Sequence, residues 1–320
     1  GRILQPITGF RTGLIEGPDL LTRYSRPVSF GIRRCEFDHY LLGRTGARLR
    51  LGTPLTSLRA DGDRFIVNDE IAAPLVVGAG GHFCPVARLM TSGTRDSEVV
   101  VLAQEIEFEM TADQRCECRV EEQVPELFFC EDLKGYGWCF RKGNFLNVGL
   151  GREGEARLSA HVDQFIDRLV SRGRIPYGLT KRFHGHAYRL YLGPPRTPTD
   201  DRVLLIGDAA GLAYPQSGEG IRPAIESGLL AAATILETPR QYWNQLASRL
   251  QRKMLERFGR RGSAGGSARL IPHSWRRFAA RRLLSSPWFS RRVLIERWFL
   301  HMDQPALDPA SIAPAMAMAE

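Results

Sequence analysis

One stretch constrains the fold of this chain more than any other. The apolar run VLLI ends at Ile206, and the turn GDAAGLAYPQSGEG follows it up to Gly220. The chain then resumes with IRPAIESGLLAAATIL, which is typical of a helix. Glycines let a backbone approach a ligand closely, and the start of a helix offers N–H groups without intrahelical partners. A bare strand-to-helix connection needs only one glycine, so a turn with four of them favours a ligand site over an empty turn.

Composition sets the limits of what the chain can be. Its 320 residues can bury one large core or two interleaved ones, with 43% hydrophobic and 25% charged residues. No apolar run approaches the roughly 18 to 20 residues that cross a bilayer. Of the six cysteines only Cys116 and Cys118 are close in sequence, and no second Cys/His pair stands at ligand spacing. These features predict reduced thiols, a cytoplasmic location and no metal site.

The order of the expected elements predicts an α/β fold. A helical period covers residues 30–48, short strands follow, and LVVGAGG reads as a buried strand ending near Gly81. Residues 96–151 read as several antiparallel strands, a helix follows at about 156–171, and VLLIGD returns to a buried strand. The chain therefore leaves an α/β domain, builds a β-rich part and comes back. The expected divisions are 1–95, 96–195, 196–240, basic C-terminal helices at 241–303, and a disordered tail at 304–320.

Three stretches carry a resemblance to a known family. GDAAGLAYPQSGEGIRPAIESGLLAA closely resembles a segment of the para-hydroxybenzoate hydroxylase-type flavoproteins, and within them of the geranylgeranyl reductase-like branch. GYGWCFRKGNFLNVGLG at 135–151 looks like that branch's Tyr-x-Trp-x-Phe-Pro-Lys segment, and IRRCEFD at 32–38 looks like its Arg-x-x-Phe-Asp helix. The resemblance implies an FAD-binding, Rossmann-like domain interleaved with a β-rich substrate domain, followed by C-terminal helices.

The resemblance also implies roles for single residues. Asp208 would hold the ribityl chain of FAD, and the glycines and Glu219 after it would shape the flavin pocket. For Arg34, a solvated side chain is nearly as good an interpretation as a cofactor contact. The residues implied for cofactor binding are Arg34, Gly207, Asp208, Gly211, Pro215, Gly218, Glu219 and Gly220.

A second set of residues is expected on the substrate side. Tyr136, Trp138, Phe140 and Lys142 recur at period two, so they share one face of a strand. By themselves such aromatics are more often a sheet core than a binding wall. The family places this segment in its substrate domain, which makes the two interpretations equal. Arg141 stands where the family has proline, which puts the pocket edge in question.

Two further departures concern the nucleotide. GAGGHFCPVAR resembles the superfamily's Gly-Ala-Asp-Gly segment, but Gly80 replaces the aspartate, and Cys84 is expected as a small buried residue. The strand, G-x-G-x-x-G turn and helix that would hold the FAD pyrophosphate are not found at the start. GLGREG at 149–154 matches that pattern formally, but it ends the substrate-domain segment and is rejected. We therefore expect that the dinucleotide-binding unit precedes Gly1.

The sequence thus predicts an FAD-dependent oxidoreductase. Reduced flavin, with NAD(P)H as a candidate electron donor, would deliver hydride to a carbon–carbon double bond of an isoprenoid-like or other apolar small molecule. An FAD-dependent aromatic monooxygenase or halogenase on the same scaffold is the first alternative. A truncated, non-catalytic remnant that has lost FAD is the second. No catalytic residue is assigned at this stage.

Two remaining features leave alternatives open. His184 and His186 share a strand face without a nearby carboxylate, which favours partly exposed histidines over a metal or acid/base pair. Basic residues are dense from Arg249 to Arg297, and no nucleic-acid-binding motif accompanies them. Residues 276–300 also carry aromatics, so this region either contacts anionic membranes peripherally or packs its aromatics on the protein, with solvated arginines. The five apolar residues in question are Trp288, Phe289, Leu294, Trp298 and Phe299.

Overall fold

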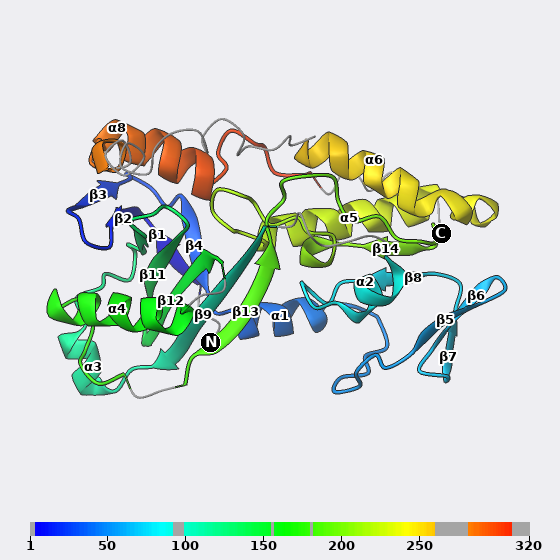
Figure 1. The fold of residues 1–320 in the computed structure, drawn as a ribbon, viewed down its shortest axis with the longest axis horizontal. Helices are drawn as coiled ribbons and strands as arrows, with labels where there is room; N and C mark the ends of the chain where they lie inside the picture. The colour runs from blue at the N-terminus through cyan, green and yellow to red at the C-terminus, as the bar shows by residue number, and fades with distance from the viewer. Residues whose placement is uncertain (1–3, 92–98, 155–156, 180–181, 260–280, 309–320) are drawn as a thin grey trace. The chain divides into compact units, whose positions relative to one another are not determined.

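The computed structural model describes residues 4–91, 99–154, 157–179, 182–259 and 281–308 (Figure 1). By their contacts these residues form two compact units. Unit 1 takes its residues from Gly1–Arg48, Val101–Ala187 and Arg269–Asp303. Unit 2 takes its residues from Leu49–Val100, Tyr188–Ala268 and Gln304–Glu320. Each unit is therefore assembled from three segments that are distant in sequence, and the division expected from the sequence stays a prediction.

Unit 1 is built on a seven-stranded sheet in the order β13-β9-β12-β11-β10-β2-β3. The pairings described between β9, β12, β11 and β10 are antiparallel, as is the β2–β3 hairpin, while β10 pairs parallel with β2. A smaller antiparallel pair joins β1 to β4. The strands are β1 (Leu4–Ile7), β2 (Gly9–Leu14), β3 (Asp19–Arg23), β4 (Ser29–Ile32), β9 (Val100–Glu109), β10 (Glu126–Phe129), β11 (Gly135–Lys142), β12 (Phe145–Glu153) and β13 (His184–Arg189).

Helix α4 (Leu158–Ser171) covers one face of this sheet (Figure 1). Its buried residues Val162, Phe165 and Leu169 are three and four positions apart and so share one face of the helix. Phe165 fits because Gly137 of β11 has no side chain: a Cβ there would lie 2.6 Å from the Phe165 ring. The helix predicted at about 156–171 is thereby confirmed.

The opposite sheet face meets the C-terminal part of the chain. Helix η4 (Ser290–Phe299), preceded by the short α8 (Pro287–Phe289), packs through the fully buried Leu294 and Ile295. The ring centroid of Phe299 lies 5.3 Å from that of Tyr136 in a T-shaped contact. Most of the apolar residues of this segment are thus used in packing. Helices α1 (Arg34–Leu42) and α3 (Ala112–Glu117) complete the unit.

Unit 2 contains the strand that the glycine-rich turn follows. β14 (Val203–Leu205) pairs in parallel with β8 (Val76–Gly78), and all three residues of β14 are buried. A three-stranded antiparallel sheet lies elsewhere in the unit. The remaining elements are β5 (Leu58–Asp61), β6 (Arg64–Val67), β7 (Ile71–Ala73), α2 (Pro85–Met90), η1 (Gly207–Ala209), α5 (Ile221–Glu237), η2 (Arg240–Gln245) and α6 (Leu246–Phe258).

The core of unit 2 lies between β14 and the two long helices. Leu204, Leu230 and Leu250 belong to one buried cluster, to which α6 contributes residues at helical spacing. The α/β fold with a β-rich part is confirmed by this arrangement. Among the described residues, every helix is too short or too polar to cross a bilayer.

The chain end departs from expectation. Residues 309–320 lie outside the described residues, as do 260–280 of the predicted basic helices. Gln304–Leu307, however, which belong to the tail predicted as disordered, are held by hydrogen bonds to helices α5 and α6. Composition suggested disorder here because alanine, proline and methionine follow Asp303, but two arginines bind the backbone of this segment.

Candidate functional site

The glycine-rich turn of unit 2 has the geometry that its sequence predicted. β14 ends at Leu205, η1 follows, and α5 begins after the N-cap residue Gly220. Gly211 and Gly218 have φ of +76° and +67°, a region that favours glycine. A Cβ on Gly211 would lie 2.8 Å from Cδ of Arg189, and one on Gly218 would lie 2.4 Å from the Tyr188 hydroxyl. The side chains of Arg189 and Tyr188 thus occupy the space that a Cβ at these two positions would need.

Hydrogen bonds fix the shape of this turn. The N–H of Gly207 donates to Oγ of Ser227 in α5 over 2.9 Å. The N–H of Tyr214 donates to the carbonyl of Glu219, and the N–H of Gly218 donates to the carbonyl of Tyr214. Residues 214–219 are therefore a closed loop set on the start of α5. Pro215 lies within this loop, half-buried.

Two carboxyl groups lie at the start of α5. A Cβ on Gly220 would be 3.0 Å from Oδ1 of Asp208, so that carboxylate lies directly against the helix N-cap. Oε1 of Glu219 accepts a hydrogen bond from the N–H of Arg222 over 2.8 Å. Burial raises the pKa of Glu219, and the nearby Asp208 adds to the rise, against the opposing backbone N–H groups of Arg222 and Ile221. Glu219 therefore keeps its proton to a higher pH than an exposed glutamate.

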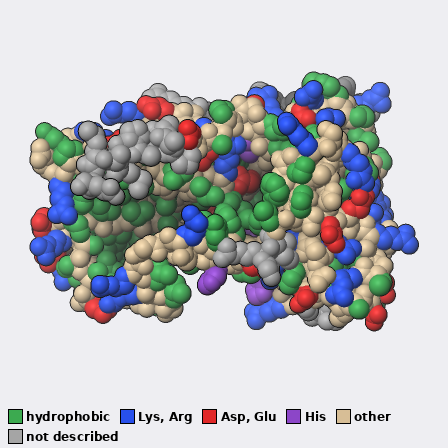
Figure 2. Space-filling view, turned by 180° about the vertical axis from the view of Figure 1, so that it is seen from behind, with side chains coloured by type: hydrophobic (Ala, Val, Ile, Leu, Met, Phe, Trp, Pro, Cys, Tyr) green, Lys and Arg blue, Asp and Glu red, His purple; other side chains and the backbone are tan. Residues whose placement is uncertain are grey.

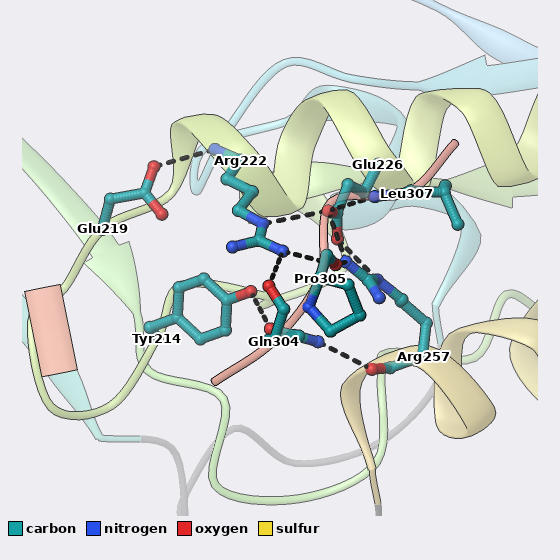
Figure 3. Close-up of polar contacts among 8 residues, drawn as sticks. All are labelled: Tyr214, Glu219, Arg222, Glu226, Arg257, Gln304, Pro305 and Leu307. Carbon is teal, nitrogen blue, oxygen red and sulfur yellow. Dashed lines mark hydrogen bonds and ion pairs between the residues drawn. The ribbon is translucent and has the colours of Figure 1, made fainter. Parts of the chain in front are cut away.

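A buried ion cluster lies one turn further along α5 (Figure 3). Glu226 is 4% exposed and accepts hydrogen bonds from Nε of Arg222 and from Nε and Nη2 of Arg257, over 2.6 to 3.0 Å. Burial alone would raise the pKa of Glu226, but the hydrogen bonds from Arg257 and Arg222 outweigh it and lower the pKa below its usual value. This cluster was not predicted from the sequence.

The predicted substrate residues lie in unit 1, along β11. Tyr136, Trp138 and Phe140 belong to the apolar cluster on the face opposite α4, together with Phe299. Nε1 of Trp138 donates to Oδ1 of Asn147 over 2.7 Å. They form part of a packed sheet face, so their role in substrate binding stays a prediction.

Lys142 is the last residue of this row, and it forms an ion pair with Glu107. Its Nζ lies 2.7 Å from Oε2 of Glu107, and the lysine is 8% exposed. The other oxygen of Glu107 accepts from Nε of Arg33 over 3.1 Å, and Arg33 also binds Glu36. The guanidinium of Arg33 lies 3.7 Å from the centre of the Phe145 ring. Arg33 and Glu107 were missed, although the alternation EIEFE at 105–109 places its acids on one strand face.

Arg34, the predicted cofactor contact, has a different environment. Its side chain is 66% exposed and pairs with Asp38 one helical turn on, over 2.7 Å. The neighbouring Arg33 is the less exposed of the two arginines, at 22%, because it is the N-cap residue of α1 and contacts Glu107 of the unit 1 sheet. The cofactor role of Arg34 stays a prediction.

The lesser motifs take the places expected of them. Cys84 is 2% exposed and packs in the unit 2 core. The stretch GLGREG lies within or next to strand β12, where Gly149 leaves room for the Trp138 ring, 2.4 Å from where its Cβ would be. His184 and His186 are exposed on β13. Among the described residues no cluster of three acidic, histidine or cysteine side chains could hold a metal.

The sequence of the chain is similar to two groups of named reductases. It is 27% identical over 251 residues to the digeranylgeranylglycerophospholipid reductase of Methanocaldococcus jannaschii, covering 71% of this chain and 62% of that protein. It is 32% identical over 164 residues to the chloroplastic geranylgeranyl diphosphate reductase of Nicotiana tabacum, covering 51% and 33%. The chain thus spans less than two thirds of either relative. No family model matches it.

Solved structures share the fold of this chain. A geranylgeranyl bacteriochlorophyll reductase-like protein from Thermoplasma acidophilum superposes with a TM-score of 0.70 at 20% identity, covering 99% of this chain and 80% of that one. The chain is homologous to the geranylgeranyl reductases. The resemblance predicted from the three motifs is confirmed. Halogenase PltM in complex with FAD shares the fold at a TM-score of 0.60 and 14% identity, covering 80% of this chain and 58% of that one.

Proposed function

We propose that this chain acts as an FAD-dependent oxidoreductase that reduces a carbon–carbon double bond of an apolar, isoprenoid-like substrate. The observation that carries the proposal is the turn from Gly207 to Gly220. It sets the half-buried carboxylate of Asp208 against the start of a long helix, where the backbone bends at glycines. The homology to geranylgeranyl reductases supports the choice of reaction.

The residues of the turn fit a flavin nucleotide. Asp208 offers a carboxylate that accepts hydrogen bonds from the hydroxyl groups of the ribityl chain. Gly211, Pro215, Gly218 and Gly220 form a cradle that a flat ring system could approach. The first N–H groups of α5 and the positive end of its dipole favour negative charge there.

When bound and reduced, FAD supplies the hydride that the reaction needs. The task of this chain is binding, orientation and proton placement. Glu219 keeps a proton on its carboxyl group at a higher pH than an exposed glutamate does. The aromatic row of β11 is the proposed apolar wall for the substrate, and Lys142 with Glu107 marks the polar end of that row. NAD(P)H as the electron donor belongs to the proposal.

A peripheral membrane contact is the finer part of the proposal. Leu294 is fully buried and Phe299 packs on Tyr136, so these two are used in the fold. Trp288 remains 68% exposed, and the side chains of Arg292 and Arg297 are 64% and 69% exposed. Figure 2 shows Lys and Arg side chains spread over the face in view, among hydrophobic ones. A tryptophan beside arginines suits an anionic lipid surface, where an isoprenoid would dissolve.

A flavin titration tests the cofactor assignment. FAD fluorescence is followed as wild-type chain, Asp208→Asn and the control Asp63→Asn are added; Asp63 is an exposed acid of the same unit. Asparagine keeps an acceptor but loses the charge, so a neutral hydrogen bond replaces a charge-assisted one; this difference of about 1–1.5 kcal/mol should raise the flavin Kd about 5- to 12-fold in Asp208→Asn alone. Overlaid curves for the wild-type chain and Asp208→Asn would overturn the assignment.

Turnover without oxygen separates the reaction classes. With chemically reduced FAD and an isoprenoid alkene under anaerobic conditions, a reductase forms the saturated product. A monooxygenase or halogenase forms product only when oxygen is admitted. Product that appears solely in air would replace the reductase proposal with the second class, whose fold neighbours include the halogenase above.

A further inference from the structure

The segment Gln304–Leu307 has no regular secondary structure, yet its backbone is bound at several atoms (Figure 3). Nη2 of Arg222 donates to the carbonyls of Gln304 and Pro305 over 2.8 and 2.9 Å. Nη2 of Arg257 donates to the carbonyl of Pro305 over 2.7 Å. The side-chain amide of Gln304 donates to the carbonyl of Arg257 over 3.0 Å. Residues of helices α5 and α6 therefore bind one short segment without regular secondary structure.

Charge and the number of N–H donors explain why Arg222 and Arg257 need acceptors from this segment. Arg222 and Arg257 bring two positive charges, and Glu226 brings one negative charge. A guanidinium has five N–H donors and no acceptor, so one buried carboxylate cannot satisfy both arginines. The carbonyls of Gln304 and Pro305 accept three further hydrogen bonds from these guanidinium groups, and Pro305 adds no N–H that would compete.

The same segment contacts the proposed flavin turn. The hydroxyl of Tyr214 donates to Oε1 of Gln304 over 2.8 Å. Burial raises the pKa of Tyr214 to about 12, so the hydroxyl keeps the proton that it donates. At the other end of the turn, Arg222 uses its backbone N–H for Glu219 and its guanidinium for Gln304 and Pro305. Both ends of the loop 214–219 are thus tied to one segment.

We propose that Gln304–Leu307 is a positioning strap, which fixes the turn 214–219 through Tyr214 and, by way of Arg222, through Glu219. The strap contacts no reacting group itself. It holds the loop in the conformation that presents Asp208 and Glu219 at the start of α5. Its consequence for flavin rests on the proposed function, whereas the coupling between strap and loop does not.

Hydrogen exchange measured by mass spectrometry on the chain without flavin tests the coupling. Tyr214→Phe and Gln304→Met each remove the Tyr214–Gln304 hydrogen bond, and Tyr177→Phe is the matched control because Tyr177 is 87% exposed. The protected amides of Tyr214 and Gly218 should exchange about 2- to 10-fold faster in both variants. The double variant should exceed Gln304→Met by no more than about 2-fold, since Gln304→Met already removes the Tyr214–Gln304 bond, together with the bond from the Gln304 amide to the carbonyl of Arg257.

Rescue and selectivity separate positioning from bulk stability. Gln304→Glu keeps an acceptor for the Tyr214 hydroxyl but loses the donor to the carbonyl of Arg257, so it should restore part of the protection at Gly218 that Gln304→Met removes. Amides in the middle of α6 should keep their wild-type exchange rates in Tyr214→Phe. Unchanged exchange at Gly218 in Gln304→Met, or an equal rise throughout α5 and α6, would overturn the strap.

A parallel FAD titration keeps the two proposals apart. If flavin binds at the turn, its Kd should rise in Tyr214→Phe and Gln304→Met by a factor like that of the exchange rates, and stay unchanged in Tyr177→Phe. Faster exchange with no flavin effect would support the coupling and reject its role in the flavin site. A flavin effect without faster exchange would reject the strap and leave the flavin site in place.

Discussion

Substitution of Gly218 by alanine gives the sharpest test of the turn geometry, because two independent costs coincide there. The residue has φ of +67°, where an alanine costs about 1–2 kcal/mol relative to right-handed conformations. The new Cβ would also lie 2.4 Å from the hydroxyl oxygen of Tyr188 and 2.8 Å from its Cε2. Overpacking of this kind costs about 1–3 kcal/mol. The expected loss of unfolding free energy is about 2–5 kcal/mol.

A second glycine separates the two costs. Gly52, also in unit 2, has φ of +71°, but a Cβ there would meet nothing within 4 Å. Gly52→Ala should therefore lose only the backbone cost, about 1–2 kcal/mol. The difference between the two variants measures the clash with Tyr188 alone.

Hydrogen exchange of the buried amides of α5 reports the opening of unit 2 separately from unit 1. Gly218→Ala should open more readily than Gly52→Ala by a factor of about 5 to 150, which corresponds to about 1–3 kcal/mol. Equal exchange in the two variants would mean that Tyr188 does not occupy the space behind the turn. The close-packed cradle on which the flavin assignment rests would then be wrong.

Three further outcomes are expected. The folded-state pKa of Glu226 is lowered, so its contribution to stability is present above the usual value of 4.5 and is lost as the pH falls through the folded-state pKa. In urea unfolding, the free energy of unfolding of the wild-type chain should therefore fall at acid pH, and Glu226→Gln should show a flatter pH profile. Lys142→Met should lower the thermal midpoint, and Glu107→Gln added to it should lower the midpoint further, because Glu107 still pairs with Arg33 after the first substitution. Changing Arg291 and Arg292 together to Gln should weaken co-sedimentation with anionic vesicles at low salt; no sedimentation of the wild-type chain would reject the membrane contact.

Local patterns in the sequence were enough for the elements that carry the site. A short apolar run followed by glycines predicts a strand and a turn, and the turn from Gly207 to Gly220 was found where the pattern placed it. The period of α4 and the alternation along β11 are equally local. These elements could be predicted because hydrophobic periodicity and backbone freedom depend only on residues that are neighbours in the sequence.

The ion cluster and the strap could not be predicted in this way. Glu226 is an ordinary polar residue within an apolar helix, and its partner Arg257 lies 31 residues further on. Gln304 lies 82 residues beyond Arg222, at the start of a stretch whose composition predicts disorder. Such contacts depend on which helix faces meet. Nor could the sequence show which of Arg33 and Arg34 contacts Glu107, since only the packing of α1 decides which arginine faces that side chain.

The ion cluster around Glu226 also helps to explain why the pKa of Glu219 is raised. Arg222 is close enough to Glu219 to donate its backbone N–H to that carboxylate, but its guanidinium is turned toward Glu226. If the guanidinium paired with Glu219 instead, the pKa of Glu219 would fall, as paired carboxylates do. Glu226 and the strap accept hydrogen bonds from that guanidinium instead, and Glu219 is left half-buried near Asp208 with a raised pKa. The acid one turn along the helix thus holds the Arg222 guanidinium away from Glu219, whose pKa stays above its usual value.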